Sequence, residues 1–560
     1  MTPAQRIARL TGRDAFLKLL VDEGVTHLFG NPGTTELAIM EAVPGTPELN
    51  YVLGTQEAVV VGMADGFARA SGRLAAVSLH VAPGLGNAMG ALYNAKFSGS
   101  PLIVTCGQQE QGHGLLEPLL YDPLVPIAAP MVKWAIEATR VEDLPRILRR
   151  AAKVALTPPT GPVFVSLPGD VLDAEAELDL GHATRIEAAT RPSDDALDRL
   201  AARLLAAKRP AIIAGHELAT RDAFAEATAL AELLGAAVYQ QSVPYAASFP
   251  SEHPLYLGAF TRSQKLVRAA LEDYDLLVCL GADLLRMSVM SPVSPLPETL
   301  PVVHISERDW ELGKNYPTDL AIRADVKQTL AALLPRLAAA RTPQLAQAAS
   351  GRGAALAPKN WSAQRDKLRV DALLAAETTP IDPRFLMLRL AESIPPDAVV
   401  VEEALTSANT LPGVLAVRER QRFYGLASGG LGFGVPGAAG VSLALPGRPV
   451  VAVIGDGSAL YGIQALWTVA HHKLPVTYVI ANNRSYRILK ERLVSFRGSD
   501  RFVGMDLRDP EIDYTGLARS MGLAARRVTD PADIAPALRE AVKSGAPQLI
   551  EVMVADGFGG

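Results

Sequence analysis

Short apolar segments rich in β-branched residues alternate along the whole chain with segments of helical hydrophobic spacing. These segments are apolar on consecutive positions instead of alternating with polar residues. Such runs are typical of strands buried on both faces of a parallel sheet, and parallel strands need helical crossovers between them. The sequence therefore predicts an α/β fold of doubly wound parallel sheets. The predicted strands are HLFG (27–30), YVLGT (51–55), AAVSLH (75–80), PLIVTC (101–106), GPVFVSLP (161–168), PAIIAG (210–215), AAVYQQ (236–241), DLLVCLG (275–281), VVHIS (302–306), AVVVEE (398–403), PVVAVIG (449–455), PVTYVIAN (475–482) and PQLIEVMV (547–554).

The chain is too long for a single hydrophobic core. It has 560 residues, and domains commonly hold about 100–200 residues. An acidic, weakly periodic stretch around residues 170–192 follows the first group of strands. A second stretch, 337–365, is rich in Ala, Gln, Pro and Gly, a composition that suits an exposed connector. We therefore predict three domains of similar α/β character, at 1–185, 192–340 and 370–560.

The composition of the chain indicates which binding partners and which cellular compartment to expect. The formal net charge of −5 gives no reason to expect binding to nucleic acid or to an anionic membrane. Cys106 and Cys279 lie inside apolar runs, which predicts reduced core thiols and neither a disulfide framework nor a metal site. The N-terminal segment lacks the apolar core of a signal peptide, and no apolar stretch reaches the roughly 18–20 residues of a membrane span. We predict a cytoplasmic protein.

Two of the predicted strands run directly into polar residues. PVVAVIG is followed by Asp456, and PVTYVIAN by Asn483. The carboxyl ends of neighbouring parallel strands lie at one sheet edge, which is where open α/β sheets bind ligands. A carboxylate, an amide oxygen and nearby backbone carbonyls are hard oxygen donors that suit Mg²⁺ or Ca²⁺. The alternative is a plain turn with an asparagine cap, but the pairing of the two strand ends favours a ligand.

The residues around Asp456 also suit a phosphate group. Gly455 and Gly457 allow backbone and ligand to approach closely. Residues 459–472 are expected to form the crossover helix. Its start just after Ser458 would offer free N–H groups and a positive dipole end to an anion. The sequence therefore predicts a site for a divalent cation together with a diphosphate.

At this point the sequence resembles a known superfamily, the thiamin diphosphate-dependent enzymes that include the 2-oxo acid decarboxylases and the acetohydroxyacid synthases. Within it, the benzoylformate decarboxylase group is the most similar, and the resemblance extends over nearly the whole chain. It implies pyrimidine-binding, central and diphosphate-binding domains in that order, with thiamin diphosphate and Mg²⁺ as cofactors. It also implies a homodimer at minimum and more commonly a homotetramer, with active sites at the dimer interface. The segments that carry it are FGNPGTTE (29–36), QEAVVVGMADGFARAS (56–71), LHVAPGLGNAMGALYNA (79–95), SPLIVTCGQQ (100–109), GGLGFGVP (429–436) and IGDGSALYGIQALWT (454–468).

The resemblance assigns catalytic roles to three residues of the first domain. Glu57 would contact the aminopyrimidine ring, through which a proton is relayed to activate the thiazolium carbon, although a carboxylate in a first helical turn is also ordinary dipole complementation. His80 would transfer protons on the substrate or intermediate, although a histidine at a strand end is often structural. Thr34 stands where the group carries a serine that touches the substrate carboxylate, although TTELAIMEAV is also a strong helix-capping pattern.

The resemblance assigns the remaining cofactor contacts to the third domain. The backbone carbonyl of Gly429 would hold the amino group of the cofactor, and Leu431 would lie between its two rings. Asp456, Asn483 and the backbone carbonyl of Ser485 would bind the metal. The diphosphate site would comprise Gly455, Asp456, Gly457, Ser458 and Asn483.

The sequence departs from the benzoylformate decarboxylase pattern at two places. Ser288 stands where the group has a second active-site histidine, and His113, in GQQEQGHG, could take over that role or be a solvated loop residue. Beyond the metal site, small or aromatic pocket positions become Ile488 and Arg492 in a basic helix. That helix is either a solvated face or a sign of a polar or acidic substrate. His471 and His472, at the end of the crossover helix, are interpreted as structural.

Three functions remain open from the sequence. The first is decarboxylation of a 2-oxo acid to an aldehyde and CO₂, which His80 and Thr34 favour. The second is a carboligase or lyase of the acetolactate synthase or 2-hydroxyacyl lyase type, which the loss of a histidine at Ser288 favours. The third is a regulatory or scaffolding protein without activity, against which Glu57, Asp456 and Asn483 argue. The substrate or partner would be a small 2-oxo acid or aldehyde.

Overall fold

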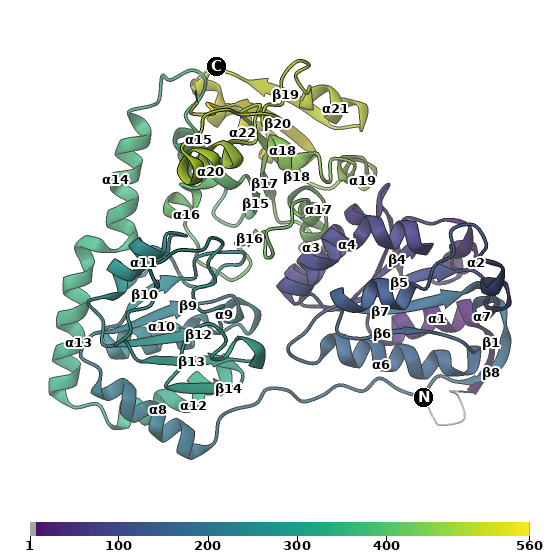
Figure 1. The fold of residues 1–560 in the computed structure, drawn as a ribbon, viewed down its shortest axis with the longest axis horizontal. Coiled ribbons are helices and arrows are strands. Elements are labelled where there is room, and N and C mark those ends of the chain that lie inside the picture. Colours follow the sequence, from purple (N-terminus) through teal and green to yellow (C-terminus); the bar gives the residue numbers. More distant parts are fainter. Residues whose placement is uncertain (1–6, 559–560) are drawn as a thin grey trace.

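The structure is a computed structural model that describes residues 7–558. It contains three six-stranded sheets in which all neighbouring strands run parallel. Helices flank each sheet, and the three units meet near the middle of the molecule (Figure 1). The prediction of three doubly wound α/β units is confirmed.

The N-terminal and C-terminal sheets share one strand order. Numbered by appearance within each unit, both read 2-1-3-4-6-5. The N-terminal sheet comprises β3 (Asn50–Leu53), β2 (His27–Gly30), β4 (Ala75–His80), β5 (Leu102–Gln108), β7 (Val163–Pro168) and β6 (Ala135–Glu137). Its helices are α1 (Gly12–Asp22), α2 (Leu37–Ala42), α3 (Glu57–Ser71), α4 (Val81–Ser98), α5 (Leu124–Ala128), α6 (Leu144–Leu156) and α7 (Gly169–Asp173).

The C-terminal unit repeats this arrangement with its own helices. Its sheet comprises β16 (Phe423–Gly425), β15 (Val399–Glu403), β17 (Val450–Gly455), β18 (Val476–Asn482), β20 (Gln548–Met553) and β19 (Ala524–Val528). Its helices are α15 (Pro383–Ser393), α16 (Leu411–Val414), α17 (Gly434–Ala444), α18 (Asp456–Ala459), α19 (Ala465–His471), α20 (Arg487–Arg497), α21 (Tyr514–Ser520) and α22 (Ile534–Lys543).

The central unit has the order 3-2-1-4-5-6, which is the order of dinucleotide-binding sheets. Its sheet comprises β11 (Tyr256–Ala259), β10 (Ala237–Gln240), β9 (Pro210–Ala214), β12 (Leu276–Leu280), β13 (Val302–Ser306) and β14 (Leu320–Arg323). Its helices are α8 (Asp194–Ala206), α9 (Glu217–Thr220), α10 (Phe224–Leu234), α11 (Gln264–Leu271) and α12 (Val326–Ala339).

The strands that the sequence analysis missed are almost all edge strands. β6, β11, β14, β16 and β19 each end a sheet, whereas the buried central strands were all predicted. An edge strand has a neighbour on one side only and is usually short, so it need not show the continuous apolar run of a central parallel strand. In β19, for example, four of the five residues are not buried.

The Ala-rich stretch 337–365, predicted as an exposed connector, is mostly exposed and joins the central and C-terminal units, but it is helical, which the sequence analysis did not predict. It continues α12 into α13 (Pro343–Leu356) and α14 (Trp361–Leu373), which run along the left of Figure 1 from the central to the C-terminal unit. Alanine and glutamine favour helix, and Thr342 caps α13 ahead of a proline in the first turn. Trp361 is only 2% exposed, and its indole N–H donates to the Pro412 carbonyl at 2.8 Å.

The acidic stretch 170–192 is only partly a linker. Its first part forms α7 and then β8 (Glu175–Asp179), which pairs antiparallel with β1 (Ile7–Thr11) in a separate two-stranded sheet. Since β8 is mostly exposed, its sequence carries little hydrophobic signal. From 180 to 193 the chain has no helix or strand.

One continuous hydrophobic core joins the N-terminal and C-terminal sheets. Its centre is the contact of α3 with α17, where glycines let the two backbones touch. A Cβ on Gly66 would lie 2.2 Å from the carbonyl oxygen of Gly437, and a Cβ on Gly440 would lie 1.9 Å from that of Met63. Only glycine permits such an approach, so the sequence fixes how these two units are held together.

Candidate active site

Asp456 and Asn483 lie at neighbouring strand ends, as the sequence predicts. β17 pairs in parallel with β18, with Gly455 opposite Ala481, and Asp456 and Asn483 follow the two strands. Their exposed fractions are 4% and 5%. The Asn483 Oδ1 accepts hydrogen bonds from the backbone N–H of Ser485 at 2.9 Å and from its hydroxyl at 3.3 Å. The loop after β18 is thereby folded back at the sheet edge.

The carboxylate of Asp456 is suited to bind a cation. Its Oδ2 is buried and has no hydrogen-bond partner within the described part of the chain. Burial raises the pKa of Asp456 to about 6, although backbone N–H groups of Gly457, Arg484 and Ser485 act in the opposite direction. A buried polar atom without a partner calls for a ligand, and a carboxylate with amide and carbonyl oxygens is the donor set of Mg²⁺. The residues present therefore fit the metal.

The helix after β17 differs from the prediction of one helix over 459–472. α18 begins at Asp456, spans four residues, and is separated from α19 by a turn in which a Cβ on Gly462 would lie 2.8 Å from the ring of Pro436. So short a helix contributes only a small dipole. Anion binding here would depend on the metal and on single N–H groups. Gly457 keeps the approach open, since a Cβ there would lie 2.6 Å from the Tyr486 ring.

Glu403, at the end of β15, holds the glycine-rich segment 429–434 in place. Its carboxylate accepts hydrogen bonds from the backbone N–H groups of Gly432, at 2.7 Å, and of Gly434. Burial raises the pKa of Glu403 to about 8, against those hydrogen bonds. The sequence analysis missed this residue, although AVVVEE ends in acidic side chains at the same sheet edge as Asp456.

Residues 427–428, just before the glycine-rich segment, are hydrogen-bonded to the N-terminal unit of the same chain. The Asn94 Oδ1 in α4 accepts hydrogen bonds from the N–H groups of Ala427 at 3.1 Å and Ser428 at 3.2 Å. Gly429 follows with a φ of +88°, in the region that favours glycine. Leu431 is half-buried. Its predicted position between the cofactor rings stays a prediction.

Glu57 is the first residue of α3 and is 8% exposed. Its two carboxylate oxygens accept hydrogen bonds from amide groups, one from Asn31 Nδ2 and one from Asn87 Nδ2, both at 3.0 Å. The carboxylate packs against Gly84, where an added Cβ would lie 3.2 Å from it. The helix is capped by Gln56, whose side chain accepts the Val59 N–H. Glu57 is therefore not needed as the cap and is free for another role.

His80 and the buried Glu36 form a pair that the sequence analysis did not predict. His80 Nδ1 lies 2.9 Å from Glu36 Oε2 and 3.1 Å from Thr35 Oγ1. Since a carboxylate only accepts, we assign the proton to Nδ1, which leaves Nε2 available for proton transfer. Nε2 forms no hydrogen bond within residues 7–558.

Glu36 itself is fixed from three sides. It is 0% exposed and accepts hydrogen bonds from Gly33 N–H, Gly107 N–H and Thr35 Oγ1, each at 2.8 Å. Glycine is required at both backbone donors, because a Cβ on Gly107 would lie 2.0 Å from Glu36 and one on Gly33 would lie 2.2 Å from His80. The signal was present in the sequence, as Glu36 ends the segment FGNPGTTE.

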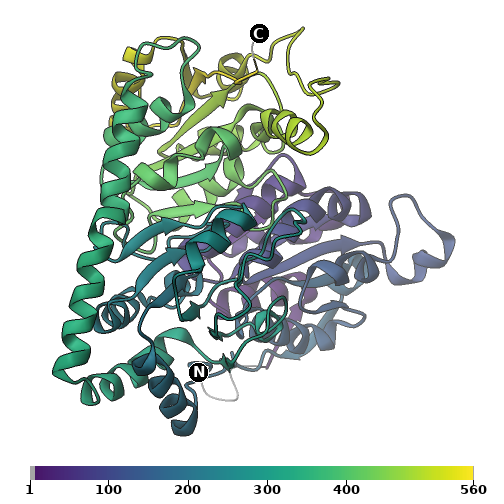
Figure 2. The ribbon, with the colours of Figure 1, turned by 60° about the vertical axis from the view of Figure 1, so that its left-hand side comes forward.

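Thr34 does not cap a helix, so that alternative is wrong. The short helix Thr34–Glu36 has Gly33 as its N-cap, and α2 follows with Glu36 in that position. Thr34 is exposed. His113 is also exposed and lies in a 3-10 turn, Gln111–Leu116, within a loop that projects from the N-terminal unit (Figure 2).

Ser288 is exposed and lies in the loop after β12. Two residues earlier, Arg286 donates from its guanidinium to the Ala427 carbonyl at 2.8 Å and stacks over Phe97 at 5.1 Å. The central unit thus reaches the glycine-rich segment through Arg286.

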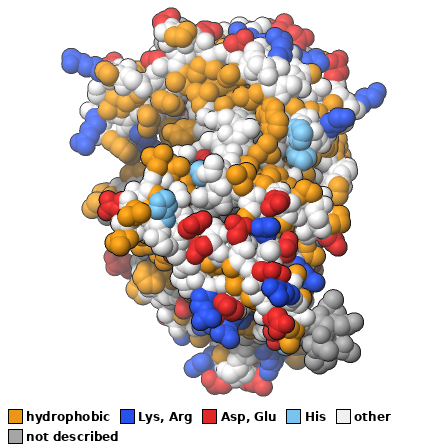
Figure 3. All heavy atoms as spheres, turned by 90° about the vertical axis from the view of Figure 1, so that its right-hand side faces the viewer, with side chains coloured by type: hydrophobic (Ala, Val, Ile, Leu, Met, Phe, Trp, Pro, Cys, Tyr) orange, Lys and Arg blue, Asp and Glu red, His pale blue; other side chains and the backbone are white. Residues whose placement is uncertain are grey.

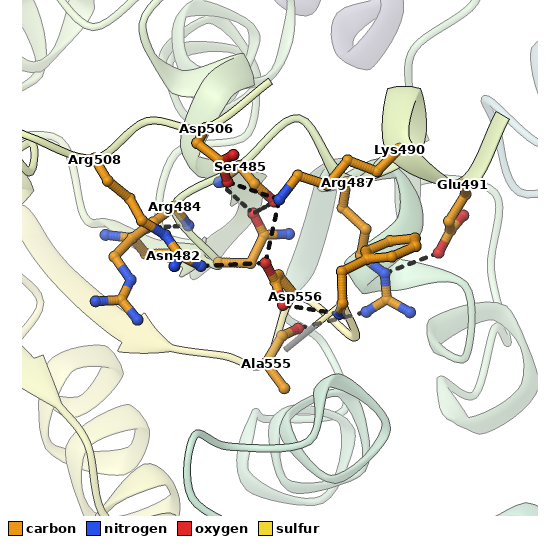
Figure 4. A network of polar contacts seen from close by, with 12 residues as sticks. Asn482, Arg484, Ser485, Arg487, Lys490, Glu491, Asp506, Arg508, Ala555 and Asp556 are labelled. Carbon is orange, nitrogen blue, oxygen red and sulfur yellow. Dashed lines mark hydrogen bonds and ion pairs between the residues drawn. The ribbon is translucent and has the colours of Figure 1, made fainter. Parts of the chain in front are cut away.

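In α20, the inward-pointing cation is Lys490 and not Arg492. Lys490 Nζ lies 2.6 Å from Asp506 and 3.4 Å from Asp556, and its side chain is 4% exposed. It also packs over the rings of Phe502 and Phe558, at 5.2 and 5.9 Å. Figure 4 shows how this network joins α20, the following loop and the C-terminal segment. Arg492 and Ile488 are half-buried, and Arg492 stacks on Phe496 at 5.4 Å.

Comparison with known proteins agrees with this geometry. The chain matches the sequence models of the thiamine pyrophosphate enzymes in three parts: the N-terminal TPP binding domain at residues 10–117, the central domain at 197–333 and the C-terminal TPP binding domain at 410–552. The chain belongs to the thiamine pyrophosphate enzyme family. Asp456 and Glu57 thus lie in the two matched TPP binding domains.

Three members of this family illustrate the range of activities among its relatives. A benzoylformate decarboxylase from Pseudomonas aeruginosa is 33% identical over 97% of this chain and 98% of its own. An acetolactate synthase large subunit from Escherichia coli is 26% identical over 95% of this chain and 92% of its own. The structure of a thiamine diphosphate-dependent 4-hydroxybenzoylformate decarboxylase from Rhodococcus jostii RHA1 aligns with a TM-score of 0.86 at 32% identity, covering 98% of this chain and 99% of its own.

Glu57 and His80 belong to the N-terminal unit, whereas Asp456 and Asn483 belong to the C-terminal unit. No hydrogen bond or ion pair joins these two groups of residues in the part of the chain that the structure describes. The face that lies on the right of Figure 1 carries hydrophobic side chains over its upper half, around a hollow (Figure 3). Exposed apolar side chains also occur on the loops of both units, such as Leu115, Leu119 and Val503. Apolar surface of this kind is typical of interaction sites.

Proposed function

We propose that the protein is a Mg²⁺- and thiamin diphosphate-dependent 2-oxo acid decarboxylase that releases an aldehyde and CO₂, with carboligation as a side activity. The observation that supports decarboxylation best is His80, which is held by a fully buried Glu36 with Nε2 left available. A fixed histidine of this kind suits a proton donor. Relatives named as benzoylformate and 4-hydroxybenzoylformate decarboxylases point to the same reaction class.

The proposed roles combine the resemblance to the family with the contacts of each residue. Asp456, Asn483 and the Ser485 carbonyl would hold Mg²⁺, and the Gly455–Ser458 turn would bind the diphosphate. The Gly429 carbonyl and Leu431 position the rings. When bound, the cofactor supplies the electron sink for decarboxylation. Glu57, fixed by two amides, holds or accepts a proton at the pyrimidine ring.

The remaining candidate residues are assigned to binding and protonation of the substrate. The exposed hydroxyl of Thr34 binds the carboxylate of the substrate, and His80 Nε2 donates the proton that completes the product. Ser288, Ile488 and Arg492 are proposed to line the pocket, with His113 as a second candidate proton donor. Because Lys490 is already paired with two carboxylates, the inward cation of α20 is no argument for an acidic substrate.

Assembly is part of the proposal. No hydrogen bond or ion pair joins the two groups of residues within residues 7–558, and loops of both units carry exposed apolar side chains. We therefore propose that a second copy completes each site in a homodimer, further paired into a homotetramer. We also propose a cytoplasmic location, to which the buried free thiols of Cys106 and Cys279 are suited. No helix among residues 7–558 is long and apolar enough to cross a membrane.

A carboligase of the acetolactate synthase or 2-hydroxyacyl lyase type is the second candidate. Ser288 favours it, since its exposed hydroxyl is a weaker proton donor than a histidine would be at that position. If protonation is slow, addition to a second carbonyl competes. The similarity to an acetolactate synthase large subunit is compatible with this alternative.

The test is turnover of the protein, loaded with Mg²⁺ and thiamin diphosphate, on pyruvate, benzoylformate and branched-chain 2-oxo acids, each with and without an added aldehyde. CO₂ and products are followed by mass. Equal amounts of aldehyde and CO₂, lost in His80→Ala but not in His113→Ala, would support the decarboxylase. CO₂ appearing only with a hydroxyketone, or ligation without CO₂, would reject it in favour of the carboligase. Absence of cofactor binding would reject both.

A further inference from the structure

A cavity of about 270 Å³ lies where the three units meet, apart from the candidate active site. The ends of α3 and α4, the loops after β9 and β13, and residues 420–424 line it. These elements converge near the centre of the molecule (Figure 1). None of the residues assigned to cofactor, metal or substrate lines this cavity.

Two guanidinium groups on the wall, those of Arg69 and Arg308, form no ion pair within the described residues. Arg69 donates to the carbonyl oxygens of Gly425, at 3.0 Å, and Tyr245. Arg308 donates to the Phe97 carbonyl at 3.2 Å. The buried carboxylate of Asp283 interacts electrostatically with Arg308, but its ion pair, at 3.5 Å, is with Arg286.

The carboxyl groups on the wall do not cancel this charge. Glu307 is paired with Arg221 at 2.7 Å. Glu217 accepts hydrogen bonds from the Ser306 hydroxyl at 2.6 Å and the Glu307 N–H at 3.1 Å, and burial raises its pKa to about 7. Near neutral pH, Glu217 is therefore partly uncharged, and the cavity keeps a positive balance.

Two buried side chains beside the guanidinium groups have polar atoms that form no hydrogen bond within the described residues. The rings of His216 and Tyr245 pack at 4.9 Å and are 3% and 2% exposed. Neither nitrogen of His216 nor the hydroxyl of Tyr245 has a hydrogen bond within the part of the chain that is described. Burial and the nearby Arg308 lower the pKa of His216 to about 3, so its ring is neutral and offers one N–H. Buried polar groups are normally satisfied, so this pair indicates a missing ligand.

The size and shape of the site exclude a dinucleotide. The central sheet has the strand order of dinucleotide-binding folds, with its crevice expected between β9 and β12. Here that crevice is closed, because a Cβ on Gly215 would lie 2.0 Å from the carbonyl oxygen of Gly281 and 2.3 Å from Ala282. What remains is smaller than the roughly 300–1,000 Å³ of pockets for drug-sized ligands.

We propose that this junction cavity binds a small oxyanion, either inorganic phosphate or a small carboxylate, through Arg308, Arg69, the Tyr245 hydroxyl and the His216 ring N–H. Planar guanidinium groups suit both carboxylate and phosphate. The anion would connect side chains from the N-terminal and central units. Anion binding at this cavity goes beyond the proposed catalytic function and does not depend on that function.

The test is calorimetric titration of the full chain with sodium phosphate and, separately, sodium succinate, with sodium chloride at matched ionic strength as blank. Each titration is run with and without saturating thiamin diphosphate and Mg²⁺, since phosphate can also enter an empty diphosphate site. We expect saturable binding that persists in the loaded protein and raises the unfolding temperature. Whether phosphate or succinate binds more tightly identifies the source of the anion.

Three variants locate the site. Arg308→Met should weaken binding about tenfold or more. Arg323→Met, which removes an exposed arginine of the same unit that forms no side-chain hydrogen bond or ion pair within the described residues, should leave binding unchanged. Tyr245→Phe removes only an unpaired hydroxyl, so it should weaken anion binding without lowering the unfolding temperature of the anion-free protein. No saturable binding, or equal affinity in Arg308→Met and the unmodified protein, would overturn the proposal whether or not the protein proves to be a decarboxylase.

Discussion

Replacement of Lys490 by methionine tests whether the network of Figure 4 closes the region behind the metal loop. Lys490 joins α20 to two other segments, through Asp506 at 2.6 Å and Asp556 at 3.4 Å. The loop that contains Asp506 also pairs through its backbone with the proposed metal-binding loop after β18. The Tyr486 N–H donates to the Met505 carbonyl at 2.8 Å, and Ser485 and Asp506 form an antiparallel β-bridge. Loss of Lys490 should therefore loosen the segment that supports Ser485.

The magnitude follows from the burial of each partner. A hydrogen bond to a charged group contributes about 1.5–3 kcal/mol, and each cation–π contact about 0.5–1 kcal/mol. Asp506 is 41% exposed, so water replaces much of its interaction, and Asp556 keeps Arg508 at 3.2 Å. Methionine also avoids the cost of burying a charge. We expect a net loss of about 2 kcal/mol in the local opening free energy, which is about 30-fold in the opening equilibrium.

The assay is hydrogen exchange of peptides covering 499–510 and 554–558, read by mass spectrometry, because global unfolding of a three-unit chain is not two-state. Exchange of both peptides should accelerate about 30-fold in Lys490→Met. Lys490→Arg should restore protection, and Arg497→Met, an exposed cation of the same helix, serves as the matched control. Less than a twofold change, or equal acceleration in α12, would refute the reasoning.

Three further predictions concern the candidate active site and the helix contact. Glu57→Gln should lower kcat by about 10²–10⁴-fold while cofactor affinity, measured by fluorescence quenching, stays within a few fold; unchanged kcat would remove Glu57 from the mechanism. The folded-state pKa of Asp456 is raised to about 6. Between about pH 4 and pH 6 the metal-free folded protein therefore binds more protons than the unfolded chain, and its stability should fall as pH rises. Mg²⁺ affinity measured by calorimetry should increase over the same range, and Asp456→Asn should abolish both trends. Gly440→Ala places a Cβ 1.9 Å from the Met63 carbonyl oxygen and should lower the unfolding temperature. Gly86 lies in α4, where an added Cβ would meet no atom within 4 Å, so Gly86→Ala should be neutral or slightly stabilising. Equal effects of the two substitutions would contradict the packing argument.

The sequence by itself determined the α/β class, the central strands and the strand-end polar residues. Consecutive apolar residues fix a strand that is buried on both faces, and the residue after such a strand must lie at the ligand-binding edge. Asp456 and Asn483 could therefore be assigned to that edge without a structure, whereas Glu57 was singled out only by the resemblance to the family. The edge strands and the helices α13 and α14 could not be found in this way, since their formation depends on neighbours and caps more than on hydrophobic spacing.

Only the tertiary structure decided which side chains act together. Glu36 and His80 are 44 positions apart in the chain, and nothing in local periodicity links them; they meet because β4 lies beside β2 and the turn after β2 crosses its end. The same holds for Lys490 with Asp556, and for the junction cavity, whose walls come from three units. Local sequence dictates backbone conformation through short-range sterics and burial, whereas partners distant in sequence are set by how the sheets and helices pack.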